Sequence, residues 1–125
     1  MEILIIEDDK ELRALYSDFF SHEFTSTNCE FSNDGIEGYF KTSLTKFDLI
    51  ILDHEMPRFK GLDLLVALKN KPGLNQTTPV IFISGYLHDE LKKTDLFENV
   101  HFISKPFDFH SLTTIINNFS EKQST

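Results

Sequence analysis

The chain has 125 residues, of which 40% are hydrophobic and 26% are charged, and this composition fits one folded domain rather than a disordered chain. Twelve Lys and Arg residues against twenty Asp and Glu residues give a net charge of −8, which argues against attraction to nucleic acid or to an anionic membrane surface. The first apolar run is too short for a signal peptide or a membrane span, and the single cysteine cannot form an internal disulfide, so we expect a cytoplasmic protein with no membrane insertion.

The first part of the chain alternates strand patterns with helix patterns. Residues 3–6 read ILII, apolar at consecutive positions, as in a strand that is covered on both faces. From about Lys10 to Glu23 the apolar residues fall on one face of a helix: Leu12, Leu15, Tyr16, Phe19 and Phe20. Residues 27–31 alternate polar and apolar side chains, which is typical of an edge strand. A second helix follows a turn at residues 32–35 and is marked by Ile36, Tyr39 and Phe40.

The rest of the chain repeats this alternation three times. Residues 49–52, 80–83 and 100–103 read LIIL, VIFI and VHFI, and they predict three more strands. Apolar residues at helical spacing mark a helix after each of them: Leu62, Leu65 and Leu68, then Leu87 and Leu91, then Leu112, Ile115, Ile116 and Phe119. Lys71-Pro72-Gly73 closes the third helix of the chain, and Asp108 is placed to cap the start of the last one.

Five strand–helix units with right-handed crossovers wind into an open sheet that carries helices on both faces. We therefore expect an α/β fold of the flavodoxin-like, doubly wound type, with a five-stranded parallel sheet of order 2-1-3-4-5 and five helices. The domain should cover residues 1–120, and residues 121–125 should form a frayed C-terminal tail. In such sheets ligands bind beyond the carboxyl ends of the strands, where the strand order reverses.

Polar side chains follow four of the five predicted strands. Glu7 and Asp8 follow the first strand, Asp53 the third, Ser84 the fourth and Lys105 the fifth. Carboxylates brought together repel one another unless a cation or raised pKa values relieve the repulsion. Mg²⁺ suits this position because it prefers oxygen ligands and is usually held by one or two carboxylates together with phosphate oxygens. A carboxylate can also act as a nucleophile toward a phosphoryl group, whose charge a lysine and a hydroxyl can stabilise.

These motifs, in this order, resemble those of the receiver domains of bacterial two-component response regulators, of the chemotaxis-regulator type. ILIIEDD resembles the acidic pocket of the family and LIILDHEMPRFKG its phosphorylation loop. VIFISG resembles the strand that carries the switch hydroxyl, and FISKPF resembles the lysine loop. The resemblance extends from Ile3 to Phe119. Each motif alone has low specificity, whereas the four together are highly specific.

The resemblance implies an acceptor and a metal site. Asp53 would be the phosphoacceptor, and Glu7 and Asp8 would be the acidic pair that holds Mg²⁺ together with Asp53. The backbone carbonyl of Glu55 would complete the metal site. Asp9 follows the acidic pair and would not be a ligand.

The resemblance also implies how the phosphoryl group is held. Ser84 would bond it and move inward, and Lys105 would contact it. The Lys105-Pro106 bond resembles one that is cis in this family, an option open mainly to bonds that precede proline. Phe102 would be the switch aromatic, and packing alone would drive its rotation because it has no hydroxyl. Glu55 stands where the family tunes the lifetime of its acyl phosphate.

The function implied is a signalling switch rather than an enzyme. A histidine kinase or a phosphotransfer protein would donate a phosphoryl group to Asp53, and the domain would assist its own phosphorylation and dephosphorylation. The charge change would bias a protein-binding face built from the fourth helix, the fifth strand and the fifth helix. A downstream protein target or an effector domain would read that face, with no direct binding of nucleic acid.

Other interpretations compete with this one. Taken singly, the acids at residues 7–9 could cap a helix, and Asp53 could be a solvated strand end. A receiver-like docking domain that is never phosphorylated would keep the fold without the chemistry. An aspartyl-phosphate phosphatase of the haloacid dehalogenase type would need its nucleophile at the first strand and a cap domain. Nucleotide or flavin binding lacks GxxxxGK[ST] and GxGxxG. The histidines have no zinc-ligand spacing, and we expect His54 to be partly exposed.

Overall fold

The structure of the chain is a computed structural model, which describes residues 1–85 and 98–123, with side chains described as far as residue 119. Its five strands are β1 (Glu2–Ile6), β2 (Asn28–Ser32), β3 (Leu49–Asp53), β4 (Val80–Ser84) and β5 (Val100–Ser104). They form a parallel sheet of order β2-β1-β3-β4-β5, which confirms the predicted strand order and the flavodoxin-like fold.

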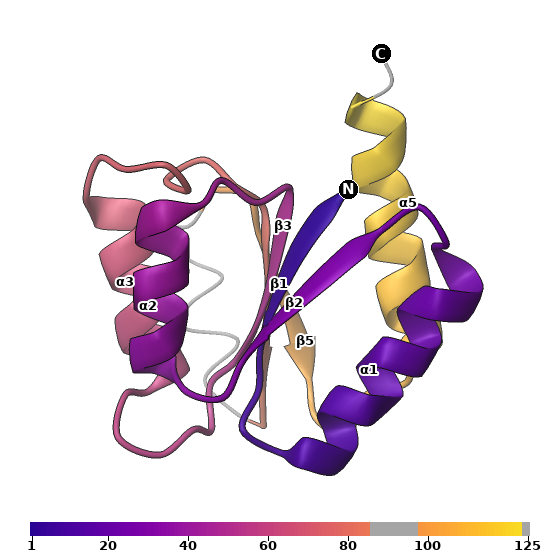
Figure 1. Ribbon diagram of the computed structural model, residues 1–125, viewed down its shortest axis with the longest axis horizontal. Coiled ribbons are helices and arrows are strands. Elements are labelled where there is room, and N and C mark those ends of the chain that lie inside the picture. The colour runs from indigo at the N-terminus through magenta and orange to yellow at the C-terminus, as the bar shows by residue number, and fades with distance from the viewer. Residues whose placement is uncertain (86–97, 124–125) are drawn as a thin grey trace.

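The helices lie in two layers (Figure 1). They are α1 (Lys10–Glu23), α2 (Gly35–Leu44), α3 (Gly61–Asn70) and α5 (Phe109–Gln123). α1 and α5 cover one face of the sheet, and α2 and α3 cover the other. The helix predicted around Leu87 and Leu91 lies outside the described residues. The predicted domain boundary at residue 120 falls within α5 and stays a prediction.

Both faces of the central strands are buried, which explains their runs of consecutive apolar residues. Alternate residues point to opposite sides of a strand, so each strand contributes to two cores. Ile3, Ile51 and Ile83 pack in a cluster with residues of α1 and α5. Leu4 and Leu52 pack with residues of α3 on the other side.

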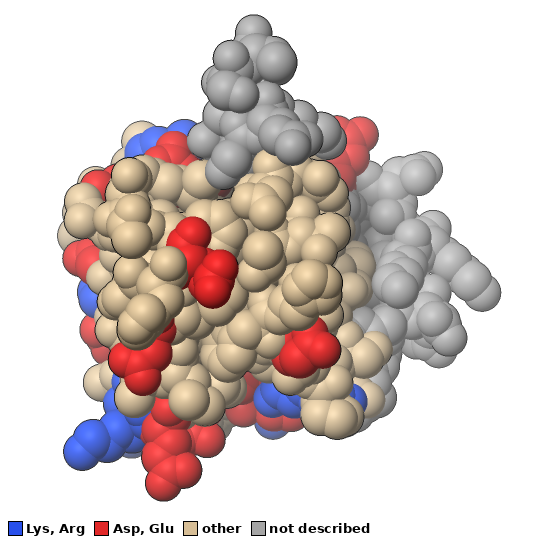
Figure 2. Space-filling view, turned by 90° about the vertical axis from the view of Figure 1, so that its right-hand side faces the viewer, with Lys and Arg blue, Asp and Glu red and all other residues tan. Residues whose placement is uncertain are grey.

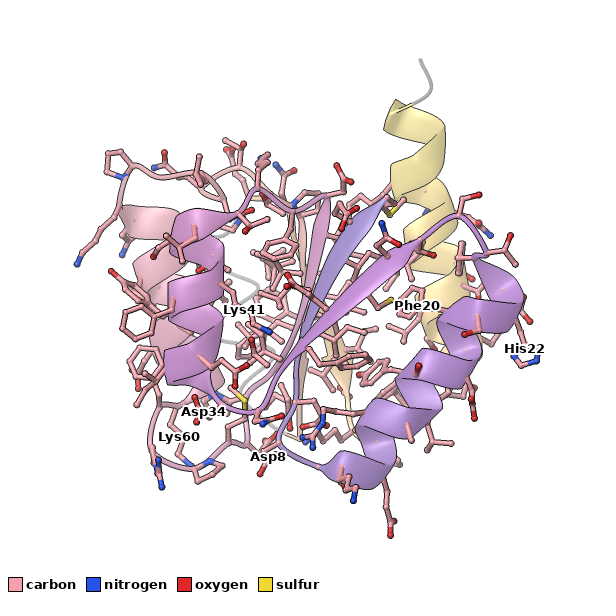
Figure 3. The ribbon with its side chains drawn as sticks, in the orientation of Figure 1. Asp8, Phe20, His22, Asp34, Lys41 and Lys60 are labelled. Atoms are coloured by element: carbon pink, nitrogen blue, oxygen red, sulfur yellow. The ribbon has the colours of Figure 1, made fainter. Side chains whose placement is uncertain are left out.

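α1 follows the predicted span, but its buried face is narrower than predicted. Asp9 caps its start, accepting hydrogen bonds from the backbone N–H groups of Glu11 and Leu12 at 2.9 and 3.4 Å. Phe20 points from α1 toward the sheet (Figure 3) and is buried, as is Tyr16. Leu15 is 52% exposed, so the prediction that it belongs to the buried face is wrong.

α2 begins at Gly35, the last residue of the predicted turn, and the side chain of Asp34 accepts a hydrogen bond from the backbone N–H of residue 37 at 2.8 Å. The apolar residues that marked this helix are not its buried face: Ile36, Tyr39 and Phe40 are 46%, 40% and 61% exposed. Gly35, Gly38 and Thr42 are buried instead. A side chain at Gly38 would lie 2.7 Å from Ile6, so the helix approaches β1 closely through its small residues.

The other two helices agree with their predicted patterns. In α3 the residues Leu65 and Leu68 are buried, and the helix ends before Lys71. In α5 the buried residues are Leu112, Ile116 and Phe119. Asp108 caps the start of α5 as predicted, because its carboxylate accepts a hydrogen bond from the backbone N–H of Ser111 at 3.0 Å.

A polar cluster is buried at the amino ends of β3 and β4. The side-chain amide of Asn75, 2% exposed, donates to the backbone carbonyls of Thr42 and Thr45 at 2.7 and 2.8 Å. Its carbonyl oxygen accepts from the backbone N–H of Phe47 and the hydroxyl of Thr78, both at 2.9 Å. Three of these hydrogen bonds join the end of α2 and the loop after it to the loop after α3, and the fourth lies within the loop after α3.

The surface over α1 and α5 carries isolated charged side chains (Figure 2). Acidic groups are scattered singly across it, and basic groups lie at its margins. No helix in the part of the chain that the structure describes is long and apolar enough to cross a membrane.

Candidate functional site

The parallel register of the sheet brings the predicted site residues to one edge. β1 lies beside β3 as far as Leu52, so Glu7 and Asp53 follow at adjacent positions. Ser84 ends β4 and lies beside the last residue of β5, which Lys105 follows. Side chains from four loops or strand ends therefore meet at the carboxyl edge of the sheet, where the fold predicts a ligand site.

Three carboxylates meet at this edge. One oxygen each from Glu7, Asp8 and Asp53 lies within 4.8 Å of the others. Asp8 lies where β1 leads into α1 (Figure 3) and is exposed, whereas Glu7 and Asp53 are only 3% and 6% exposed. Burial, a hydrogen bond with Asp53 and the charge of Asp53 together raise the pKa of Glu7 to about 9. The close acids therefore retain a proton near neutral pH, and their oxygen atoms form a set of donors that fits a hard divalent cation.

The loop that carries the acidic pair is held by Arg13. Its guanidinium donates to the backbone carbonyls of Glu7 and Asp8, both at 2.9 Å. Asp9 caps α1, which is the structural role considered above for the acids at residues 7–9. It does not belong to the acidic cluster. Arg13 was not among the predicted site residues, although an arginine in the first turns of a helix can reach back to the loop before it.

Lys105 is the cation of the site. Its ammonium nitrogen lies 2.7 Å from Asp53 Oδ1 and 3.0 Å from Glu55 Oε2. Burial lowers the pKa of Lys105, but the hydrogen bonds and charges of the two carboxylates outweigh burial and raise it. The backbone N–H of Lys105 donates to the carbonyl of Ser84 at 3.0 Å, and the Lys105-Pro106 bond is cis, as the family resemblance predicted.

The side chain of Glu55 has contacts that the sequence analysis did not predict. Its Oε1 accepts hydrogen bonds from the backbone N–H of Gly85 at 3.0 Å and from the Ser84 hydroxyl at 3.3 Å. The backbone N–H of Glu55 donates to Asp53 Oδ1 at 3.3 Å. The metal role predicted for Glu55 concerns its backbone carbonyl and stays a prediction.

The loop after Asp53 is shaped by close packing against the start of α3. A side chain at Gly61 would clash with the carbonyl oxygen of Asp53 and would lie 2.6 Å from the Cα atom of His54. The prediction that His54 is partly exposed is wrong, because it is 6% exposed. Its Nδ1 accepts the backbone N–H of Leu62 at 3.1 Å, and its ring packs 5.6 Å from that of Phe82. His54 thus supports the loop, as does the buried side chain of Met56.

Two further features bear on ligand access and on the predicted switch. The acids and Lys105 line an open groove of about 830 Å³ together with Leu12, Pro106 and Phe107. Phe102, the predicted switch aromatic, is half-buried, and its ring lies 5.7 Å from that of Phe82. The structure therefore brings the predicted acids and Lys105 into one open groove, whereas Ser84 is buried beside it, in contact with Glu55.

The sequence matches a known family over most of its length. The family described as the response regulator receiver domain matches residues 3–117 of the chain. The chain belongs to this family. It is thus a receiver domain of the kind used in two-component signalling.

Curated relatives contain a similar domain within longer chains. The probable transcriptional regulator ycf29 of Pyropia yezoensis is 33% identical over 119 residues, which cover 94% of this chain and 52% of that protein. The transcriptional regulatory protein CrdR of Helicobacter pylori is 32% identical over 120 residues, which cover 94% of this chain and 54% of that protein. The chain therefore spans about half the length of the curated relatives that it matches.

Solved receiver domains share the fold. The signal receiver domain of a histidine kinase from Syntrophus aciditrophicus has a TM-score of 0.80 and 30% identity, covering 94% of this chain and 88% of that chain. The receiver domain of a sensor histidine kinase from Pseudomonas aeruginosa PAO1 has a TM-score of 0.77 and 18% identity, covering 94% of this chain and 95% of that chain. The Pseudomonas structure was determined with a magnesium ion coordinated in its active site cleft.

Proposed function

We propose that this receiver domain is a phosphorylation-activated switch in which Asp53 accepts a phosphoryl group from a histidine kinase or a phosphotransfer protein. The observation that carries the proposal is the surroundings of Asp53. Its carboxylate lies within 4.8 Å of the oxygens of Glu7 and Asp8 and 2.7 Å from the Lys105 ammonium. A nucleophilic oxygen beside both a cluster of metal ligands and a cation suits phosphoryl transfer.

Mg²⁺ fits the acidic cluster. Glu7, Asp8 and Asp53 offer only oxygen ligands, and their closely spaced carboxylates carry negative charge that a divalent cation would neutralise. The bound magnesium ion of the Pseudomonas receiver domain supports this choice of metal. We expect the backbone carbonyl of Glu55 to complete the site. Bound there, Mg²⁺ would supply positive charge toward the oxygens of the transferred group.

The side chains of this protein have separate parts in the reaction. An Asp53 carboxylate oxygen attacks phosphorus and forms a new O–P bond, while the bond from phosphorus to the donor group breaks and the donor leaves with its electron pair. Lys105, which contacts Asp53, and Ser84, which ends the neighbouring strand β4, bind the oxygens of the transferred group and stabilise its charge. Hydrolysis of the acyl phosphate returns the Asp53 carboxylate and inorganic phosphate.

The phosphorylated state would be read by another protein or by an effector domain. Phosphorylation adds negative charge and acceptor oxygens, which favours inward packing of Ser84 and Phe102. Phe102 lies on β5 and packs against Phe82 on the side of the sheet that α3 covers, so a change there alters the surface beside β5. The curated relatives are transcriptional regulators about twice as long as this chain, which supports an effector partner.

The test is phosphorylation by a small donor. We expect the protein incubated with Mg²⁺ and acetyl phosphate to gain one labile phosphoryl group by intact-protein mass spectrometry. Asp53→Ala and the wild-type protein in excess chelator should gain none. Release of phosphate over many turnovers would instead identify a phosphatase. No adduct and no turnover would identify a docking domain that is not phosphorylated, and either result would contradict the proposal.

A further inference from the structure

The Glu55 side chain contacts Ser84 and Lys105, the two residues that we expect to bind the phosphoryl group on Asp53. One of its oxygens, Oε1, accepts hydrogen bonds from the Ser84 hydroxyl at 3.3 Å and from the backbone N–H of Gly85 at 3.0 Å. The other oxygen, Oε2, is buried and lies 3.0 Å from the Lys105 ammonium. A hydroxyl, a backbone N–H and an ammonium therefore converge on one carboxylate, which is the kind of donor set that binds a phosphoryl group.

We propose that the Glu55 carboxylate occupies the place of the phosphoryl oxygens in the unphosphorylated protein, and that it leaves this place when a phosphoryl group is bound to Asp53. The inference rests on the proposed function, because it takes Asp53 as the acceptor. Lys105 contacts Asp53 and Glu55 at the same time, so a group attached to Asp53 would approach the cation that Glu55 occupies.

Glu55 is well suited to imitate an anionic ligand. Its two oxygen atoms accept from the Gly85 N–H and the Ser84 hydroxyl and lie beside the Lys105 ammonium, as the oxygens of a phosphoryl group would. Glu55 also lies close to the acceptor, because its backbone N–H donates to Asp53 Oδ1 at 3.3 Å. Its side chain extends from there toward Ser84 at the end of β4.

Two consequences follow from shared donors. An incoming phosphoryl group and the Glu55 carboxylate are both anions, so they compete for Ser84, Gly85 and Lys105 and repel one another. The resting protein also holds Ser84 and Lys105 engaged before any phosphorylation. Glu55 is thus a positioning residue. It lowers the affinity of the site for phosphoryl groups and holds Ser84 and Lys105 in place before one binds.

The test measures binding of a phosphoryl analogue rather than reaction rate. Beryllium fluoride with Mg²⁺ is titrated into the wild-type protein and into Glu55→Ala, while the backbone amide resonance of Gly85 is followed by NMR. We expect Glu55→Ala to bind beryllium fluoride about tenfold more tightly, since charge-assisted hydrogen bonds to Glu55 no longer have to be broken. Before any addition, the Gly85 amide resonance should already differ between the two proteins, because its acceptor is gone.

Two further variants separate this role from general charge effects. Glu55→Gln keeps the shape and an acceptor oxygen but removes the charge, so its affinity should lie between those of the wild-type protein and Glu55→Ala. Glu23→Ala removes the same charge from an exposed position in the last turn of α1, and it should bind beryllium fluoride like the wild-type protein.

The outcomes distinguish the two proposals. Equal or weaker binding by Glu55→Ala, or an unchanged Gly85 resonance, would overturn the role of Glu55 and leave the acceptor role of Asp53 intact. Tighter binding by Glu23→Ala to the same extent would also overturn it, since net charge would then explain the gain. No binding of beryllium fluoride by any variant would overturn the proposed function, and the role of Glu55 with it.

Discussion

The two ends of the sheet each bury a polar cluster, and the two clusters differ in how their polar groups are satisfied. At the amino ends, both N–H groups and the carbonyl oxygen of the Asn75 side chain have partners at 2.7 to 2.9 Å. At the carboxyl ends, Glu7, Asp53 and Glu55 lie close together with Lys105 as their cation, and burial raises the pKa of Glu7. The Asn75 side chain has its hydrogen bonds made, whereas the second cluster has more negative than positive charge.

This difference indicates what each cluster does. A buried polar group stabilises a fold when all its hydrogen bonds are made, and destabilises it when charges lack partners. The Asn75 cluster therefore contributes to stability. The acidic cluster lowers the stability of the metal-free protein, but it provides the oxygen ligands for a divalent cation. Substitutions that remove a polar group from each cluster should accordingly have opposite effects on stability.

The largest effect on stability is expected from Asn75→Ala. The change removes four hydrogen bonds and leaves the backbone groups of Thr42, Thr45 and Phe47 without these partners, so the free energy of unfolding should fall by about 3 kcal/mol. Urea denaturation measures it. Asn117→Ala, at an exposed position of α5, is the matched control and should change stability little. A loss below about 0.5 kcal/mol for Asn75→Ala would contradict a stabilising role.

Gly61→Ala should have the next largest effect. Its new methyl group would clash with backbone atoms of Asp53 and His54, which cannot move independently of β3, so we expect a loss of about 2 kcal/mol. Gly73→Ala adds the same group where no atom lies within 4 Å and should leave thermal stability unchanged or slightly raised. Equal melting temperatures for the two variants would show that the close approach at Gly61 is unimportant.

A pH dependence is expected at the amino ends of the strands. Burial and the nearby charge of Lys46 lower the pKa of Lys69 to about 8. Because the folded protein binds this proton more weakly than the unfolded chain does, stability should rise between about pH 8 and pH 10.5 as Lys69 loses its charge.

The rise should be about 1 kcal/mol, less than the full shift implies, because the Lys69 side chain is partly exposed. A neutral amine retains two N–H donors, enough for its bonds to the carbonyls of Gln76 and Thr78. Lys69→Met should remove this part of the pH dependence, and Lys10→Met, at an exposed site, should keep it. Identical pH profiles for wild-type protein and Lys69→Met would refute the assignment.

The smallest effect is expected from Asp8→Asn. Removing one charge from the acidic cluster should stabilise the metal-free protein by about 0.5 kcal/mol, while stabilisation by added Mg²⁺ should disappear. Thermal melts in chelator and in Mg²⁺ measure both effects. Asp18→Asn removes the same charge from an exposed position of α1 and should keep the response to Mg²⁺. Retention of that response by Asp8→Asn would argue against Asp8 as a ligand.

Most of the fold could be predicted because the strands are short apolar runs buried on both faces. Patterns that depend on packing partners were less informative. The apolar residues of α2 suggested an inward face, yet Gly38 and Thr42 face the sheet, since only small side chains fit against Ile6. Leu15 likewise has helical spacing, yet it is 52% exposed.

The members of the site could be predicted from the residues that follow each strand, since parallel strands end at one edge. The contacts between side chains could not be predicted in this way. Glu55 lies two residues beyond Asp53, and only the path of the loop turns its carboxylate toward Ser84 and Lys105. His54 is buried for a similar reason, because the backbone of Leu62 provides its hydrogen-bond donor.

The most direct test of the central claim locates the phosphoryl group on the chain. Protein treated with Mg²⁺ and acetyl phosphate is reduced with borohydride, which converts an aspartyl phosphate to homoserine, and the peptides are sequenced by mass spectrometry. We predict homoserine at position 53 and its absence when Mg²⁺ is chelated. Modification at Asp8, His54 or Glu55 instead, or at no position, would contradict the claim that Asp53 is the acceptor.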